Sequence, residues 1–204
     1  MGGTRQKVLL AHSYYLAHDA KQWRKMKPYP PLATLLVASV LRERGFDVEL
    51  FDAMLAEDEA EFVRALDASE APIVGILEDN FNFLTKMCTT RNRDAALAMV
   101  AAARARSRRV AVNGSDATDH AAAYLAAGAD AVILGEPEIT FAELAEAWTA
   151  DPRAALEGIP GLALAGGTAD AAARRTPVRP FVENLDALPL PAWDLVDADA
   201  SRAA

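Results

Sequence analysis

The stretch Pro72-Ile-Val-Gly-Ile-Leu77 decides the fold, because it is an apolar run flanked by polar residues. Such runs are typical of strands buried on both faces, as in a parallel sheet that helices cover. Four other segments also have the composition of strands: Lys7–His12, Asp47–Asp52, Val110–Ser115 and Ala131–Gly135. The sequence therefore predicts five strands, and the run at 72–77 is the third of them.

Helical patterns separate the five predicted strands. After the first strand, Leu32, Leu36 and Val40 recur at four-residue spacing, and Gly45 marks the end of this helix. Further helices are predicted over residues 57–69 and 93–106, from a cap at Asp116 or Thr118 to Gly128, and around Phe141, Leu144 and Trp148. This alternation predicts an α/β fold with a flavodoxin-like (Rossmann-like), doubly wound parallel sheet in the order 2-1-3-4-5.

The alternation of strand and helix patterns ends near residue 151. We expect residues 1–151 to form the Rossmann-like domain and residues 152–204 to form a small hairpin followed by an extended arm. The hairpin is predicted at Ile159–Gly167, and the arm, from Thr176 onward, is rich in proline and has no periodic pattern.

Composition excludes several classes of function. The 204 residues carry a net charge of −8. Because binding to the phosphate backbone needs a basic surface, we do not expect this chain to bind nucleic acid by itself. No stretch approaches the roughly 20 apolar residues of a membrane helix, and no secretory signal is evident. Cys88 is the only cysteine, which excludes an intrachain disulfide or an all-cysteine iron–sulfur cluster held by this chain alone. A reducing cytoplasm fits this composition.

Polar residues follow the predicted strands where a ligand would bind. In an open parallel sheet, ligands bind beyond the carboxyl ends of the strands, at the point where the strand order reverses. Those ends carry His12-Ser13, Asp52, Glu78-Asp-Asn80, Asn113-Gly-Ser115 and Gly135-Glu136. Long aromatic loops after the first and third strands flank the reversal point, which favours a bulky ligand.

Several motifs, in this order, carry a resemblance to a known family. They are Pro28-Tyr-Pro-Pro-Leu32, Leu41-Arg-Glu-Arg-Gly-Phe-Asp-Val-Glu-Leu-Phe-Asp52, Val74-Gly75, Asn113-Gly-Ser-Asp-Ala117, Gly128-Ala-Asp-Ala-Val-Ile-Leu-Gly-Glu-Pro-Glu138, Thr140-Phe-Ala-Glu-Leu144 and Asn184-Leu-Asp-Ala-Leu-Pro-Leu-Pro-Ala-Trp-Asp194. Together they resemble the N-terminal cobalamin (B12)-binding domain of B12-dependent radical SAM proteins. The resemblance implies a cobalamin-binding module whose partner is a radical SAM domain in cis or in trans, and a methyltransferase as the full-length enzyme.

The sequence also lacks two motifs that occur in cobalamin-binding and radical SAM proteins. It lacks the C-x-x-x-C-x-x-C motif, so [4Fe–4S] and S-adenosylmethionine would belong to a radical SAM domain absent from this chain, and we assign no catalytic residue. It also lacks the D-x-H-x-x-G motif, since none of His12, His18 and His120 fits it. The resemblance therefore implies base-off cobalamin without a histidine ligand to cobalt, and no metal-ligating residue.

The resemblance implies a set of cofactor contacts. Gly75 and Gly114 would leave room for the nucleotide tail, because a glycine has no Cβ to obstruct it. Tyr29, Phe81, Phe83 and Met87 are candidates to cover the corrin faces. The complete set of expected contacts is His12, Tyr29, Pro30, Leu32, Gly75, Glu78, Asn80, Asn82, Asn113, Gly114, Ser115, Asp116, Gly135 and Glu136.

Other interpretations of the same residues remain open. Gly75 and Gly114 would equally serve close packing without a ligand, and His12 would equally be a hydrogen-bonded loop histidine. A flavodoxin-like hydrolase or transferase would use the strand-end carboxylates Asp52, Glu78 or Asp79. A response-regulator-like sensor is the third alternative, but its acidic cluster and its lysine after the fifth strand are not visible.

Overall fold

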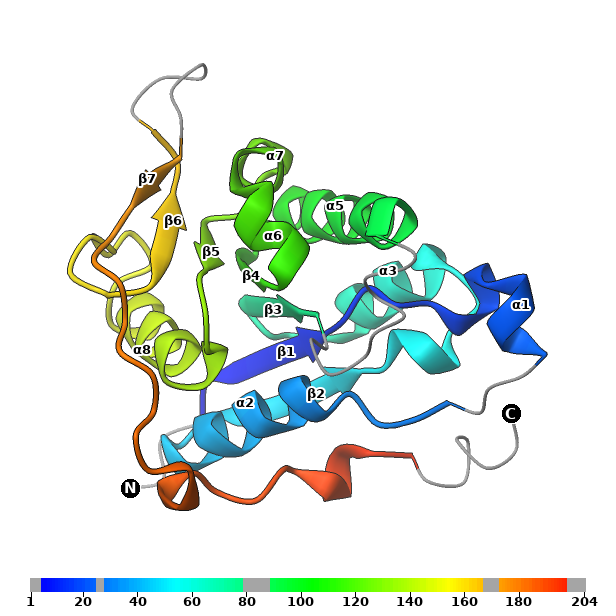
Figure 1. Cartoon of the computed structure of the whole chain (residues 1–204), viewed down its shortest axis with the longest axis horizontal. Coiled ribbons are helices and arrows are strands. Elements are labelled where there is room, and N and C mark those ends of the chain that lie inside the picture. Colours follow the sequence, from blue (N-terminus) through cyan, green and yellow to red (C-terminus); the bar gives the residue numbers. More distant parts are fainter. Residues whose placement is uncertain (1–4, 25–27, 79–88, 167–172, 198–204) are drawn as a thin grey trace.

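A computed structural model describes residues 5–24, 28–78, 89–166 and 173–197. Within these ranges the strands are β1 (Lys7–Ala11), β2 (Asp47–Phe51), β3 (Ile73–Leu77), β4 (Arg109–Asn113), β5 (Ala131–Ile133), β6 (Leu162–Leu164) and β7 (Arg174–Arg175). They form one sheet in the order β2-β1-β3-β4-β5-β6-β7 (Figure 1). Strands β1 to β5 are parallel and confirm the predicted order. The sheet has seven strands rather than the predicted five, because β6 and β7 extend it antiparallel.

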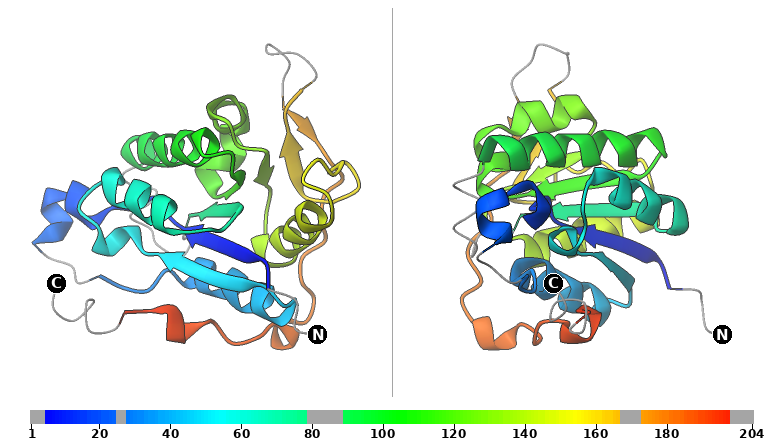
Figure 2. Two further views of the ribbon diagram at one scale, coloured as in Figure 1. Left: turned by 180° about the vertical axis from the view of Figure 1, so that it is seen from behind. Right: turned by 90° about the vertical axis from the view of Figure 1, so that its right-hand side faces the viewer.

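Helices cover both faces of the sheet. They are α1 (Ala20–Trp23), α2 (Leu32–Glu43), α3 (Glu59–Ala68), α5 (Thr89–Ala105), α6 (Ser115–Asp119), α7 (Ala121–Ala127) and α8 (Pro137–Ala150). Helices α2 and α8 lie on one face, and α3, α5 and α7 lie on the other (Figure 2). None of the helices in the described ranges combines the length and apolarity that a bilayer crossing requires.

Side chains alternate along the strands, which divides the core into two layers. In β1, Leu9 packs with the α3 and α5 side, whereas Val8 and Leu10 pack with the α2 and α8 side. Successive residues of a strand point to opposite faces, so this alternation follows directly from the strand conformation. Both faces of the central strands are therefore buried, as the apolar run at 72–77 predicts.

Gly75 in β3 allows α8 to lie close to the sheet. A Cβ atom there would be 2.6 Å from Phe141 Cε2 and 2.7 Å from Leu10 Cδ2. Both side chains are fully buried. The space beside Gly75, where we expected the nucleotide tail of a cofactor, is thus filled by two core side chains.

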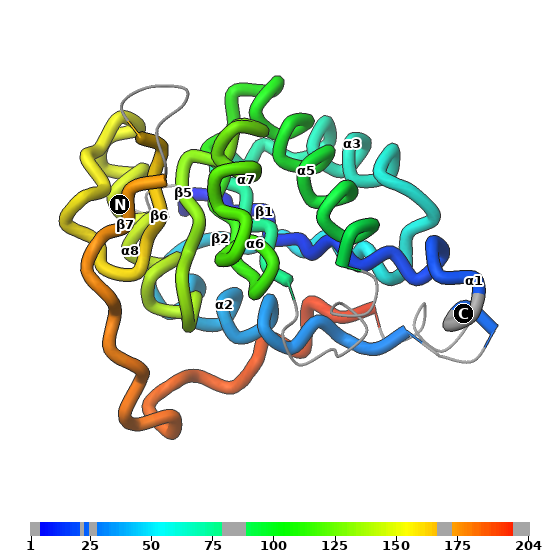
Figure 3. The backbone as a smooth tube through the Cα atoms, turned by 45° about the horizontal axis from the view of Figure 1, so that its top comes forward, coloured from blue at the N-terminus to red at the C-terminus, as the bar shows by residue number. Residues whose placement is uncertain are grey.

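The described residues that follow α8 pack back onto the domain. The predicted hairpin at 159–167 contains β6, which pairs with β5 on one side and with β7, further along the chain, on the other. The arm then passes α8 and reaches the outer side of α2 (Figures 1 and 3). Arg179 pairs with Glu143 of α8, and Arg42 of α2 donates two hydrogen bonds to Asp194, of 2.7 and 2.8 Å.

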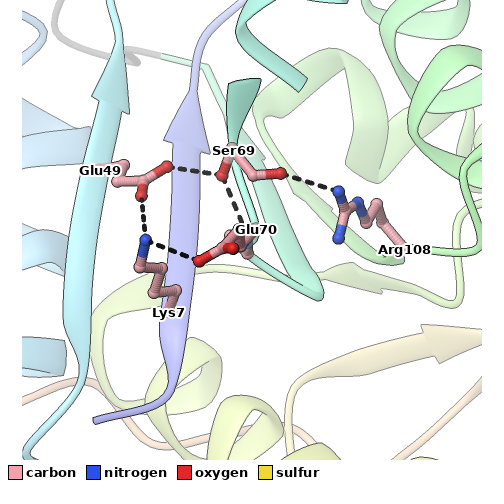
Figure 4. Close-up of polar contacts among 6 residues, drawn as sticks. Lys7, Glu49, Ser69, Glu70 and Arg108 are labelled. Carbon is pink, nitrogen blue, oxygen red and sulfur yellow. Dashed lines mark hydrogen bonds and ion pairs between the residues drawn. The ribbon is translucent and has the colours of Figure 1, made fainter. Parts of the chain in front are cut away.

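A polar network joins the elements at the amino ends of β1 and β2 (Figure 4). Lys7 Nζ lies 3.4 Å from carboxylate oxygens of both Glu49 and Glu70. Ser69 Oγ donates to Glu49 Oε2 at 2.5 Å, and Arg108 donates to the Ser69 carbonyl at 2.8 Å. These contacts connect β1, β2, the end of α3 and the start of β4, so this edge has a structural role.

Candidate functional site

The carboxyl ends of the parallel strands bring together most of the described residues predicted to form the site. His12 follows β1 and Asp52 follows β2, and His12 Nε2 lies 2.8 Å from Asp52 Oδ1. His12 Nδ1 accepts a hydrogen bond from the Tyr14 backbone N–H at 3.4 Å, which assigns the ring proton to Nε2. Asp52 Oδ1 also accepts from the Met54 backbone N–H at 3.0 Å. Both ring nitrogens of His12 are therefore engaged, and this pair holds two loops together.

Glu78 lies at the end of β3 and is buried, with 5% of its surface exposed. Its backbone N–H donates to the Asn113 carbonyl at 2.9 Å, and Ser13 Oγ donates to its Oε1 at 3.5 Å. Burial raises the pKa of Glu78 to about 7, and the nearby charge of Asp116 adds to this effect. Ser13 and Arg93 act in the opposite direction, but they do not offset the burial.

The turn after β4 explains how so large a side chain fits there. A Cβ atom on Gly114 would lie 2.5 Å from Glu78 Oε2 and 2.9 Å from Glu78 Cβ. Such distances are well inside van der Waals contact, so the Glu78 side chain occupies the space that any larger residue at position 114 would need. Gly114 also has a φ of 157°, which residues with a Cβ rarely adopt.

Asp116 forms the most strongly bonded side-chain cluster of the site. Arg93 of α5 donates to both of its carboxylate oxygens, and Arg93 Nε lies 2.8 Å from Oδ2. The Tyr124 hydroxyl of α7 donates to Oδ2 at 2.8 Å. Burial alone would raise the pKa of Asp116, but the hydrogen bonds from Arg93 and Tyr124 lower it. Asp116 does not cap the helix as expected, because the N-cap of α6 is Gly114.

Removal of the Tyr124 hydroxyl tests the contribution of this cluster. Tyr124→Phe should lower the free energy of unfolding by about 1.5 kcal/mol at neutral pH, because a buried carboxylate loses a hydrogen bond. Since Asp116 has a lowered pKa in the folded chain, the loss should shrink as the pH falls through that pKa and the carboxylate is protonated. Urea denaturation of both proteins at neutral and at acidic pH measures this, and an equal loss at both would contradict it.

Asn113, the last residue of β4, has an unused acceptor. Its Nδ2 donates to the carbonyls of Ile133 and Gly135, at 3.1 and 3.0 Å. Its Oδ1 is buried and has no hydrogen-bond partner among the described residues. Buried polar atoms are seldom left unpaired, so this oxygen is suited to accept a hydrogen bond from a ligand hydroxyl or amide.

A small pocket of about 220 Å³ opens beside these residues. It is lined by Glu78, Thr89, Arg93, Ser115, Asp116, Asp119 and His120. A pocket of about 450 Å³ lies next to it, between the loop after β1 and the start of α5. Within the described ranges, no group of three or more His, Cys, Asp or Glu side chains could hold a metal ion.

Comparison with known proteins identifies the family. The model of the B12 binding domain matches residues 27–145, which is more than half of the chain. The chain belongs to the B12-binding domain family. This match spans β2 to β5 and includes Glu78, Asn113 and the turn at Gly114.

Longer proteins contain similar domains. An uncharacterized methyltransferase of Pyrococcus horikoshii, PH0819, is 38% identical over 74 residues, which are 36% of this chain and 15% of the relative. The cobalamin-dependent S-adenosylmethionine radical enzyme OxsB, with aqua-cobalamin bound, gives a TM-score of 0.69 at 16% identity, over 94% of this chain and 24% of that chain. The radical S-adenosylmethionine methyltransferase TsrM of Kitasatospora setae gives 0.62 at 20% identity, over 84% and 30%. The chain thus spans less than a third of each of these proteins.

The other residues predicted to contact the cofactor lie in different environments in this B12-binding domain. Tyr29 packs against Tyr14, Leu16 and Met54, whereas Gly75 lies in the core beside Phe141. Glu136 accepts a hydrogen bond from the Val182 backbone N–H of the arm, at 2.8 Å. Pro30 and Leu32 are half-buried at the start of α2, Ser115 is exposed, and a Cβ at Gly135 would meet open space. Asn80 and Asn82, with Phe81, Phe83, Met87 and Cys88, lie outside the described residues.

Two residues of this edge were not predicted from the sequence. Arg93 and Tyr124 both bind Asp116, yet each lies in a predicted helix without any motif around it. Their separation from Asp116, 23 positions for Arg93 and 8 for Tyr124, shows no local pattern. A buried aspartate after a strand is the one signal that would have prompted a search for a cationic partner.

Proposed function

We propose that this B12-binding domain is the cobalamin-binding module of a radical SAM methyltransferase. The observation that carries the proposal is the family match over residues 27–145, because it includes the carboxyl ends of β2 to β5. OxsB with aqua-cobalamin bound shares the fold over 94% of this chain. The printed name of PH0819, a methyltransferase, supports the same class of reaction.

The described residues fit a ligand rich in amide and hydroxyl groups. Asn113 Oδ1 is a buried acceptor without a partner in the part of the chain that the structure describes, and it would accept a hydrogen bond from a ribose hydroxyl or a corrin amide. Ser115 would donate to the phosphate or ribose of the tail, and Tyr29 would cover part of the corrin. When bound, cobalamin would supply a methyl group carried by cobalt, while this chain would bind and orient the corrin.

We further propose that the cofactor binds base-off and without a histidine ligand. His12 is the histidine at the central strand ends, and its two nitrogens already contact Asp52 and Tyr14. His18 stacks on Tyr15 with ring centroids 5.1 Å apart. His18 Nε2 also lies 3.9 Å from Glu59 Oε2. Because other groups of the chain already engage both rings, neither is expected to bind cobalt, which supports a lower face without imidazole.

We also propose that a radical SAM domain, in cis or in trans, covers the arm. Large apolar side chains of the arm are at least half exposed: Val178, Phe181, Leu185, Leu190 and Trp193. The ion pairs of Arg179 and Asp194 hold the arm against α8 and α2, so these side chains are presented outward. OxsB and TsrM have most of their length outside the matched part, which is where such a partner domain would come from.

Reconstitution tests the cofactor assignment directly. After incubation with hydroxocobalamin and desalting, the chain should retain corrin absorbance with a base-off spectrum. Asn113→Ala should weaken binding about tenfold, as expected for the loss of one buried hydrogen bond of ~1.4 kcal/mol. Asn184→Ala, which changes an exposed asparagine of the arm, should leave binding unchanged. A colourless protein after desalting would contradict the proposal.

A further inference from the structure

Glu78 is placed to act on any ligand that enters the turn at Gly114. Its carboxyl group lies directly against the position that a Cβ of residue 114 would occupy, with Oε2 2.5 Å from it. It also lines the pocket of about 220 Å³ together with Ser115 and Asp116. A ligand group held by Asn113, Gly114 and Ser115 would therefore meet the Glu78 carboxyl group.

Within the described ranges, no cation beside Glu78 is free of another carboxylate. The groups that face it are Ser13 after β1, Arg93 of α5, Asp116 of α6 and Tyr124 of α7. Arg93 is engaged by both oxygens of Asp116, so its charge is largely neutralised there. Asp119 and His120 complete the rim of the pocket. Among the described side chains, the ionised carboxylate would thus have the Ser13 hydroxyl, 3.5 Å away, as its hydrogen-bond donor.

We propose that Glu78 is a specificity-determining residue of the cofactor site: the anionic nucleotide tail of cobalamin binds at the Gly114 turn only while the Glu78 carboxyl group is protonated. This inference rests on the proposed cobalamin-binding function and deepens it. The tail carries a phosphodiester with one negative charge, which a buried carboxylate would repel at short range. A protonated carboxyl group removes the repulsion and is itself a hydrogen-bond donor to the phosphate.

The inference predicts that tail binding takes up a proton. Because burial raises the pKa of Glu78 to about 7, the neutral form predominates below that pH and is depleted above it. Affinity for cobalamin should therefore fall by up to tenfold for each pH unit above neutrality. Cobinamide has the corrin but not the nucleotide tail, so its affinity should not follow this dependence.

The experiment compares the full chain with Glu78→Gln and with Glu43→Gln, a matched change of an exposed glutamate at the far end of α2. Dissociation constants for hydroxocobalamin and for cobinamide are measured by spectral titration at about pH 6 and about pH 8. For hydroxocobalamin, the ratio of the native constant to that of Glu78→Gln should rise about tenfold between the two pH values. The Glu43→Gln protein should behave as the native chain. Because both dissociation constants refer to the same ligand at the same pH, their ratio does not depend on any titration of the ligand itself.

A second variant tests the same group without replacing it. Ser13→Ala removes the hydroxyl that donates to Glu78, so the pKa of Glu78 should rise and the loss of affinity should move to higher pH. The inference would be overturned if the ratio of the hydroxocobalamin dissociation constants of the native chain and Glu78→Gln stayed constant with pH. It would also be overturned if the corresponding ratio for cobinamide changed equally with pH. Either outcome would leave the proposed cobalamin binding intact. If no protein binds either corrin at either pH, both the inference and the proposed function fail.

Discussion

Phe141→Ala should lower the free energy of unfolding by about 3–5 kcal/mol, the range for deleting a buried aromatic side chain. Phe141 is fully buried in α8, where it contacts the sheet beside Gly75 and Leu10. Glycine at position 75 cannot fill the cavity left by the ring, so little relaxation is expected. Urea denaturation followed by circular dichroism measures the loss. Thr149→Ala, at an exposed position of the same helix, should change stability by less than about 0.5 kcal/mol.

A double-mutant cycle extends this test to the role of Gly75. Gly75→Ala should cost about 1–3 kcal/mol in the native chain, because the added Cβ would meet Phe141 at 2.6 Å. In the Phe141→Ala background that cost should fall, and the close approach to Leu10 Cδ2 at 2.7 Å accounts for the part that remains. Such non-additivity is the signature of two residues in contact. If Gly75 serves a ligand instead, its substitution will weaken corrin binding and show no coupling to Phe141.

Glu78→Gln should remove a large pH dependence of stability. Burial raises the pKa of Glu78 to about 7 in the folded chain, against the ordinary value of 4.5 that applies to the unfolded chain. Between these values the folded state binds more protons than the unfolded state, so the stability of the native chain falls as the pH rises from about 4.5 to about 7. At ~1.4 kcal/mol per pH unit, the loss amounts to roughly 3 kcal/mol.

The comparison of two proteins isolates this contribution. At about pH 8 Glu78→Gln should be more stable than the native chain, and the difference should diminish toward about pH 5, where the native carboxyl group is also neutral. Glu43→Gln controls for the loss of one acidic residue at an exposed site. A difference between native chain and Glu78→Gln that is independent of pH would show that Glu78 does not titrate in this range.

The strands and their order were predictable, because the apolar runs carry that information locally. All five predicted strands are present within one or two residues of the expected starts. The two additional strands were not predicted as part of the sheet. β6 has only three residues, and β7 consists of Arg174 and Arg175 without any apolar residue. Their pairing depends on the free edge of β5, which local sequence does not reveal.

The site was predictable in position but not in its internal contacts. The strand-end rule placed His12, Asp52, Glu78 and Asn113 on one edge, as the structure has them. The sequence could not show that Phe141 fills the space beside Gly75, nor that the Glu78 side chain covers Gly114. Both contacts join residues more than 30 positions apart, and they depend on how closely two elements pack.

The position of β1 between β2 and β3 has a consequence for synthesis on the ribosome. β2 is complete at Phe51, whereas β3 ends at Leu77, so one edge of β1 has no partner strand in the interval. At ~5–20 residues per second, translation of this interval lasts roughly one to five seconds. During that time the nascent chain offers an unpaired apolar strand to neighbouring polypeptides. Slow codons between these strands would therefore lengthen the period in which the emerging protein depends on chaperones.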